Sequence, residues 1–460
     1  MRIIPKNTKV KLQFYKGIGI YDVILGIVAL AFIALIVTSN LPNKYVLAMI
    51  VLFVAAPMYI PIGDIRLYQA LAYTVKFGVA KKSFYKNKKG NSHISTIIPY
   101  ANISENCINQ KDGTVTGVIE IKPIEFNMLS DNKQNFLIEG IISNTLKNVG
   151  IFQEYDIVKL EKPIIFDNYL NNELNRIQKL IAENENKNLT ENEFRKRVEI
   201  IEDRINLIET LNTNDKIYAS AYYIALHDIS RQSLENSLDI IEQTLNNGSL
   251  EAKRLNDKEL AIFLKYSYDK DFDEREFDNY STKEYMQHIY PDSVQFKTLS
   301  TRQNGKFLTH FVITDYPLKV ENAWGQELFD IPNTKVIMKC KPVEKYKAIK
   351  RIDNAINEIL SQNTLGKASS QIDKQTHLES LQILLEGLQN DNEAFFDTTL
   401  IITSYDIDKN VENKKYVRRK LRELGFKYTE MFGRQIESYF SANINTYNKT
   451  NISRGLNSSI

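Results

Sequence analysis

The chain has 460 residues, of which 43% are hydrophobic and 10% aromatic, and this composition excludes a disordered polar chain. The net charge of +3 is unevenly divided: residues 1–90 carry 13 Lys+Arg and 2 Asp+Glu (13 − 2 = +11), and residues 91–460 carry the remaining 46 and 54 (46 − 54 = −8). An acidic second part argues against a general nucleic-acid-binding surface.

Two apolar segments lie near the start, at residues 20–37 and 45–62, with a short polar turn between them. Asp22 is the only charged residue in the first segment, and the second has none. At a rise of 1.5 Å per residue, each helix would cover most of a hydrocarbon core about 30 Å thick. The pattern predicts a two-helix transmembrane hairpin. A secretory signal peptide is the alternative, disfavoured because a second apolar segment follows and no small-x-small cleavage pattern follows Val37.

Basic residues flank the outer ends of this hairpin. Of the 13 Lys and Arg residues in residues 1–90, only Lys44 lies in the turn. The positive-inside bias then predicts that both termini and the main body are cytoplasmic, with the hairpin in a bacterial inner membrane. Residues 66–80 have a helical period that suits the membrane interface and predicts a continuation of the second span.

A polar, basic linker over residues 86–95 predicts a domain boundary near residue 91. The first domain is then residues 1–90, the membrane hairpin with its basic flanks. The second is residues 91–460, a body that periodicity and turn residues divide into helices and strands. We expect an α+β fold of βαβ-like layers with αα-hairpin insertions.

The first part of this body opens with a predicted β-hairpin, because Asp112-Gly113 supplies the positive-φ positions of a tight turn. Apolar spacing and caps predict the elements that follow. These are a helix from Ser130 to Gly150, a strand at 152–160, an αα-hairpin over 170–208, a strand at 216–227, a helix at 234–245 and a short helix around Leu260.

The second part opens with another predicted hairpin, pairing residues 294–299 with 306–314 across Asn304-Gly305. The pattern then predicts strands and helices in turn. These are a strand at 334–341, helices at 349–359 and 378–388, a strand at 398–404, a helix at 410–424, a strand at 426–431 and a helix at 435–440.

No motif for catalysis or cofactor binding occurs in the sequence. The nearest approach to a phosphate-binding loop is Leu365-Gly-Lys-Ala368, where Ser361 stands in place of the first glycine and Ala368 in place of the hydroxyl. We interpret the apolar run that ends at Asp406 as a core strand, and Cys107 and Cys340 as core thiols of a reducing compartment. We therefore predict no catalytic, cofactor-binding or metal-binding residues.

Basic residues also cluster on the predicted helix at 410–424, from Lys414 to Arg422. Such a face can meet nucleic acid or an acidic partner. Glu412 and Glu423 beside it favour the alternative, an ordinary solvated helix face.

The hairpin and its flanks, over residues 1–90, resemble the PrgI family of Gram-positive conjugation systems. The body resembles the N-terminal domain of the TrbE/CagE/VirB-four family, the large ATPases of type IV secretion. Four stretches carry the second resemblance by their order: residues 107–121 (CINQKDGTVTGVIEI), Tyr316-Pro317, residues 324–334 (WGQELFDIPNT) and residues 434–440 (RQIESYF).

The resemblance implies an inner-membrane component of a conjugative type IV secretion system, namely the anchoring and docking half of the transfer ATPase. It implies other secretion subunits and further copies of the chain as partners. ATP and magnesium are expected only in a downstream RecA-like domain, and we predict that the gene continues past Ile460 into such a domain. Two alternatives stay open: a fragment of a complete ATPase that powers DNA or protein transfer, and a membrane-tethered scaffold of another envelope process.

Overall fold

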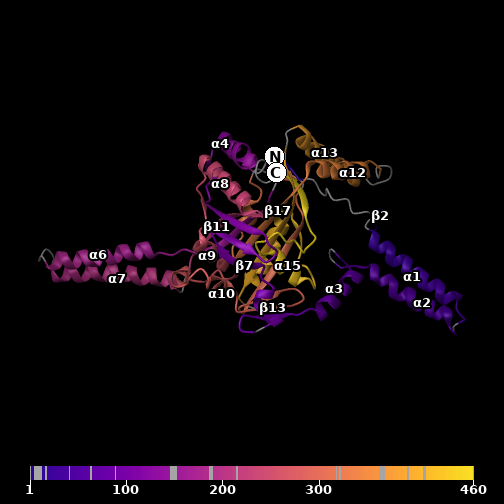
Figure 1. The fold of residues 1–460 in the computed structure, drawn as a ribbon, viewed down its shortest axis with the longest axis horizontal. Coiled ribbons are helices and arrows are strands. Elements are labelled where there is room, and N and C mark those ends of the chain that lie inside the picture. The colour runs from indigo at the N-terminus through magenta and orange to yellow at the C-terminus, as the bar shows by residue number, and fades with distance from the viewer. Residues whose placement is uncertain are drawn as a thin grey trace.

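A computed structural model gives the structure of the chain. It describes residues 2–4, 13–15, 18–40, 42–62, 65–88, 90–145, 153–185, 190–213, 216–317, 319–320, 323–361, 368–390, 393–407 and 411–458. One large antiparallel sheet forms the middle of the molecule, and helices cover both of its faces (Figure 1). Three pairs of helices, α1/α2, α6/α7 and α12/α13, extend away from it (Figure 1).

In the described part of the chain, the large sheet has eleven strands along its main path, and every ladder between them is antiparallel. In spatial order they are β6 (Ser83–Tyr85), β13 (Ser293–Phe296), β14 (Thr301–Gln303), β15 (Lys306–Asp315), β18 (Phe395–Asp406), β17 (Thr334–Val343), β10 (Glu154–Pro163), β11 (Tyr218–Asp228), β9 (Val115–Ile121), β8 (Cys107–Gln110) and β7 (Tyr100–Ser104). Three shorter strands join this path from the side: β12 (Ala252–Arg254) on β9, β19 (Lys427–Thr429) on β15 and β20 (Arg454–Asn457) on β18.

The body is an internal repeat of two halves. From the centre outward, the first half reads β10, β11, β9, β8, β7, and the second half reads β17, β18, β15, β14, β13. In each half the chain passes from a β-hairpin through a long strand, a helical hairpin, a second long strand and a helix to a short strand that pairs back on the hairpin. β10 and β17 pair antiparallel at the centre, with Ile157 opposite Met338, as a twofold axis between the halves requires.

Both predicted glycine turns are present at equivalent places in the two halves. Gly113 has a φ of 89° and Gly305 a φ of 85°, a conformation that favours glycine because it has no Cβ. The second turn joins β14 to β15. The predicted pairing of residues 294–299 with 306–314 is therefore wrong. The first of these segments is the separate strand β13, which forms its own hairpin with β14.

The expected αα-hairpins and most of the expected helices are confirmed. The helices of the body are α4 (Asp131–Asn135) continued by the π-helix η5 (Phe136–Ser143), α6 (Asp167–Glu185), α7 (Glu191–Thr213), α8 (Arg231–Asn247), α9 (Asp257–Tyr268), α10 (Tyr285–Ile289), α11 (Gln326–Phe329), α12 (Lys345–Ser361), α13 (Ala368–Asn390), α14 (Glu412–Glu423) and α15 (Gln435–Ser441). Short 3-10 turns lie at η2 (Gly90–Ser92), η3 (Ile94–Thr96), η4 (Phe126–Met128) and η6 (Glu274–Asn279). The predicted helix end at Gly150 lies outside the described residues.

The βαβ-like layering is present in a split form. β11 and β12 are both antiparallel to β9, so they run parallel to each other on its two sides, and α8 connects them. In the second half, β18, α14 and β19 repeat this arrangement around β15. The single helix α8 connects β11 to the parallel strand β12, whereas the helix pair α6/α7 connects β10 to its antiparallel neighbour β11.

Each face of the sheet has its own core. Val158 and Ile337 belong to a cluster that includes α9 and α15 residues, whereas Tyr155 and Val336 point to the other face, because successive side chains alternate. On that second face α8 buries four residues at helical spacing: Leu234, Leu238, Ile241 and Leu245. α14 occupies the equivalent place in the second half.

The apolar region near the N-terminus forms helix α1 (Ile20–Thr38) and the shorter α2 (Lys44–Ala55). In the described part of the chain, the segment Tyr21–Thr38 is the one helix long and apolar enough to cross a membrane. The expected helix over residues 45–62 is corrected: α2 ends at Ala55 and becomes a 3-10 turn, η1 (Ala56–Tyr59), because Pro57 has no N–H to continue the α-helical bonds.

A two-strand turn separates this region from the next helix. β4 (Pro61–Ile62) pairs with β5 (Ile65–Arg66), and α3 (Leu67–Val79) begins only after it. The helix expected at residues 66–80 is thus confirmed, but it does not continue the second apolar segment. Before α1, β2 (Gln13–Tyr15) pairs with β3 (Ile18–Gly19), and β1 (Arg2–Ile3) pairs with β16 (Lys319–Val320) on the body.

Candidate functional site

The base of the α1/α2 pair is fastened by polar contacts of Asp22. Arg66 Nε lies 2.9 Å from Asp22 Oδ1, so the only charge in α1 is neutralised. The hydroxyl of Tyr59 donates to the backbone carbonyl of Asp22 at 2.9 Å. These contacts join the end of η1 and the start of α3 to the first turn of α1, and they hold the two apolar helices side by side.

Helix α3 then connects this region to the second half of the body. Lys76 Nζ lies 2.6 Å from Glu437 Oε1 in α15, and the guanidinium of Arg434 lies 5.0 Å from the centre of the Tyr73 ring. Gly433, at a φ of 67°, lets the backbone come so close that a Cβ there would lie 3.3 Å from backbone atoms of Tyr73. Helix α3, which follows the apolar helices, is therefore in contact with the segment around α15.

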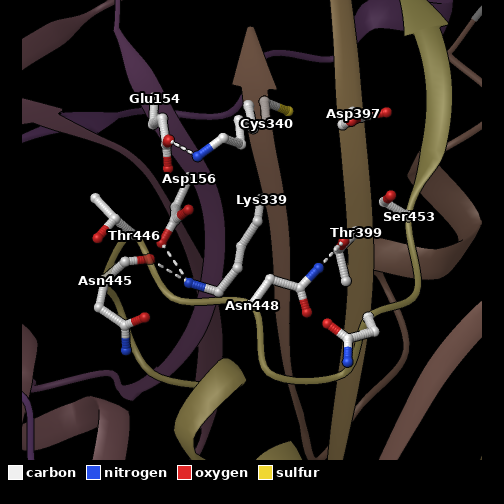
Figure 2. A pocket seen from close by; sticks show the side chains of 12 residues that line it. Glu154, Asp156, Lys339, Cys340, Asp397, Thr399, Asn445, Thr446, Asn448 and Ser453 are labelled. Carbon is white, nitrogen blue, oxygen red and sulfur yellow. Dashed lines mark hydrogen bonds and ion pairs between the residues drawn. The ribbon is translucent and has the colours of Figure 1, made fainter. Parts of the chain in front are cut away.

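A buried ion pair lies where the two halves of the sheet meet. Asp156 of β10 is opposite Lys339 of β17, and Lys339 Nζ lies 3.2 Å from Asp156 Oδ2 (Figure 2). The same ammonium donates to the backbone carbonyls of Asn443, at 2.9 Å, and Asn445, at 2.5 Å. The pair thus fixes the segment after α15 onto the centre of the sheet.

Asp156 also ends a chain of buried polar contacts that comes from β8, β9 and β11 of the first half. His227 Nε2 lies 3.3 Å from Asp156 Oδ2, and His227 Nδ1 lies 2.8 Å from Thr116 Oγ1. Gln110 Nε2 donates to the same hydroxyl at 2.6 Å. The central charges are therefore connected to the outer strands β8 and β9 through buried polar groups.

Burial and the neighbouring charges shift the pKa values of both members of this pair. Burial by itself would raise the pKa of Asp156, but Lys339 and His227 outweigh it and the pKa of Asp156 is lowered. Burial lowers the pKa of Lys339, and Asp156 partly offsets the shift. Beside them, burial raises the pKa of Cys340 to about 12, so its thiol stays protonated and is a poor nucleophile. The cluster joins β10, β17 and the segment after α15, which is a structural role.

A cavity of about 270 Å³ lies beside the ion pair (Figure 2). Its walls come from β10, β17, β18 and the segment after α15, and are formed by Glu154, Asp156, Lys339, Cys340, Lys341, Asp397, Thr399, Asn445, Thr446, Asn448, Asn451 and Ser453. Glu154 pairs with Lys341, and Asp397 lies 3.1 Å from Arg351, so both of these carboxylates already have cationic partners. Within the described ranges, no group of three His, Cys, Asp or Glu side chains is placed to hold a metal ion.

The residues considered from sequence lie as follows. Cys107 and Cys340 are buried free thiols, as predicted. Asp406 is buried at the end of β18, where its carboxylate accepts from the backbone N–H groups of Asn413, at 2.8 Å, and Lys414, at 3.2 Å, and so caps α14. This confirms the core-strand interpretation. Of the Leu365–Ala368 stretch, only Ala368 is described, as the first residue of α13.

The basic cluster on α14 is partly neutralised by carboxylates within the chain. Lys414 Nζ lies 2.9 Å and Arg418 2.5 Å from the two oxygens of Glu430, and Lys420 pairs with Glu327 at 2.8 Å. These pairs favour an intramolecular role over a nucleic-acid surface. The central Asp156–Lys339 pair was not predicted, although charged residues inside otherwise apolar strands were a signal for it.

No protein family model matches the chain, and no curated protein shows significant similarity to it. The resemblance to conjugation proteins therefore stays a prediction.

Proposed function

We propose that this chain is a membrane-anchored docking subunit of a conjugative type IV secretion machine, with its body on the cytoplasmic side of a bacterial inner membrane. One observation carries the membrane part of the proposal: the apolar side chains of α1 and α2 are exposed. Leu30 is 67% exposed and Phe53 81%. Helices that are apolar all round need lipid or protein around them, because exposing such surface to water is costly.

The proposal includes two membrane spans. The helical segment Lys44–Tyr59 covers about 24 Å at 1.5 Å per residue, less than the 30 Å of a typical hydrocarbon core. Local thinning of the bilayer accommodates such a mismatch at small cost. The packing of α2 along α1 and the Asp22–Arg66 pair favour a hairpin that enters and leaves on the same side.

A cleaved signal sequence is the competing explanation for one apolar helix near the N-terminus. Two contacts argue against it. Ile4, which precedes α1, is buried in the body together with Phe311 and Val336. Asp22 is paired with Arg66, which follows α2. Cleavage would remove both contacts, so we expect the mature protein to keep α1.

The docking role rests on the resemblance and on the paired charges of the body. The family's ATPase chemistry belongs to its C-terminal domain, and the buried charges described here are used to join strands and segments. We therefore assign this part of the protein to anchoring and assembly with other secretion subunits. A scaffold of another envelope process, or a fragment of a complete ATPase, would share this anchor.

The test is genetic and uses cells that carry the gene with its mobile element. The gene is deleted in frame and complemented with wild type, with Leu30→Lys plus Leu35→Lys, or with Ile229→Lys. Ile229 is 82% exposed on the body, so it is a matched apolar-to-lysine control. We expect the α1 variant to lose both membrane association and transfer of the element, and the control to keep both.

Two results would contradict different parts of the proposal. If the α1 variant still fractionates with membranes and supports transfer, the anchor is wrong. If the deletion leaves transfer at the wild-type frequency while the protein remains in the membrane, the secretion role is wrong and the scaffold alternative stands. An in-frame phosphate-binding loop downstream would identify the chain as part of a complete ATPase.

A further inference from the structure

The helical hairpin α6/α7, which we call the arm, extends freely from the body (Figure 1). It is inserted between β10 and β11, at the place that α12/α13 occupies between β17 and β18 in the second half. The two hairpins are therefore equivalent parts of the internal repeat. They differ in how their apolar side chains are covered.

The second hairpin has a complete core. Six side chains of α12 and α13 are at most 4% exposed and pack with Phe395 of β18: Ala348, Ile352, Ala355, Leu381, Leu384 and Leu388. Of the described apolar side chains in the arm, only Leu180 and Ile201 are buried. Ile200 is 53% and Leu207 61% exposed. The arm thus buries only the inner seam of a two-helix coiled coil, and apolar side chains beside that seam are exposed. The α12/α13 pair also exposes apolar side chains, among them Ile383 at 53%, but it has a larger buried core.

A groove of about 330 Å³ runs between the two helices of the arm. Leu180, Ile200 and Ile201 form its floor, and its rim carries four cations, Arg176, Lys179, Arg197 and Arg204, with one carboxylate, Glu183. On α7, Arg197 and Arg204 are seven residues apart, and so are Ile200 and Leu207, which is the spacing of a coiled-coil seam.

The rim keeps an excess of positive charge after its internal pairs are counted. Arg197 lies 3.9 Å from Glu183. Arg176 and Arg204 share one carboxylate, Glu173, at 2.5 Å and 3.8 Å. Four cations on the rim therefore face two carboxylates, Glu173 and Glu183. All three arginine side chains are more than half exposed, and surface pairs of this kind exchange partners at little cost.

We propose that the arm binds an amphipathic helix of another protein, which packs an apolar stripe on Ile200 and Leu207 and places carboxylates against the rim arginines. A third helix would complete the coiled coil in the helix-in-groove mode. Charge complementarity selects the acidic partner. The inference does not depend on the membrane proposal, because the arm belongs to the body.

Other occupants fit less well. A twofold contact between two copies uses the same patch on both, so the four cations and two carboxylates of this rim would face the same excess of positive charge. A phosphate backbone would satisfy the arginines but leave the apolar floor at Ile200 without an apolar partner. An anionic membrane offers acyl chains as well as headgroups, so vesicle binding is measured as a separate outcome. An acidic amphipathic helix satisfies both features.

The test uses two designed helical peptides as probes. Each has leucine at the seam positions of four heptads; one has glutamate and the other lysine at the flanking positions. Binding to the purified full-length chain in detergent is measured by fluorescence anisotropy at low salt. We expect the glutamate peptide to bind at least tenfold more tightly than the lysine peptide, and Ile200→Ser to weaken it at least tenfold.

Charge reversal supplies the decisive comparison. The variant Arg197→Glu/Arg204→Glu should reverse the preference, so that the lysine peptide binds more tightly. Arg195→Glu is the matched control, because Arg195 is an exposed arginine of α7 that does not line the groove, and it should keep the wild-type preference. Equal binding of the two peptides by wild type would overturn the proposal. So would an unchanged preference after charge reversal, self-association that Arg197→Glu/Arg204→Glu abolishes, or anionic-vesicle binding that the same variant abolishes without peptide selectivity.

Discussion

Replacing Asp156 by alanine tests the buried Asp156–Lys339 ion pair at the centre of the sheet. The Asp156 and Lys339 side chains are 3% and 8% exposed, so the variant would leave a buried ammonium with only backbone carbonyls as partners. Breaking a buried pair in this way costs about 3–5 kcal/mol of unfolding free energy. The neighbouring pair on the same two strands, Glu154–Lys341, is much more exposed, and Glu154→Ala should cost only about 0.2–1 kcal/mol.

The assay is urea denaturation of the full-length chain in detergent. The single tryptophan, Trp324, packs against Tyr316 and Phe426 in the body, so its fluorescence reports unfolding there. Asp156→Leu combined with Lys339→Met should recover part of the loss, because an apolar pair of similar size replaces the charges while the carbonyls of Asn443 and Asn445 still lose their donor. Equal losses for Asp156→Ala and Glu154→Ala would refute the reasoning. A double variant as unstable as the single one would also refute it.

Three further predictions follow from single features. Burial lowers the pKa of Lys335 from 10.5 to about 7, so between these pH values the unfolded state binds more protons than the folded state. The free energy of unfolding should therefore rise with pH from about 7 to 10.5. Lys335→Met should flatten this pH dependence in urea titrations at pH 6 to 10. Gly305→Ala, at a φ of 85° with open space around it, should cost about 1 kcal/mol in the same assay, whereas Gly78→Ala in helix α3 should not destabilise. ATP should show no saturable micromolar binding to this chain, measured with a fluorescent analogue, because the sequence has no phosphate-binding loop.

Local patterns accounted for much of the fold. The Asp-Gly and Asn-Gly turns, the helical hairpins and most strands around them follow from residues close together in sequence and were predicted. The exception is β14 beside the Asn-Gly turn, which was missed, so that β13 was wrongly paired with β15. The end of α2 was misplaced, because the prediction followed the apolar composition of residues 45–62 and did not allow for Pro57. Hydropathy shows how long an apolar segment is, whereas a proline within it shows where its α-helix can end.

The order of strands in the sheet was not predictable in the same way. Pairing of β10 with β17 joins residues that are far apart in the chain, and no local pattern specifies it. The internal repeat had a visible signal, since a hairpin, a strand, an αα-hairpin, a strand and a helix occur twice in succession. The Asp156–Lys339 pair could be predicted only from the internal repeat together with the pairing of β10 and β17, because each buried charge is explained by the residue opposite it on the neighbouring strand.

The most direct test of the account is the topology of the apolar hairpin. Single cysteines are placed at Asn40, in the turn after α1, and at Lys88, before the main body, in a chain that lacks Cys107 and Cys340. Intact cells are treated with a membrane-impermeant thiol reagent. A hairpin that crosses the membrane twice, with the body in the cytoplasm, predicts labelling at residue 40 and protection at residue 88 until the cells are opened. Labelling at residue 88 in intact cells, or protection at residue 40, would contradict it.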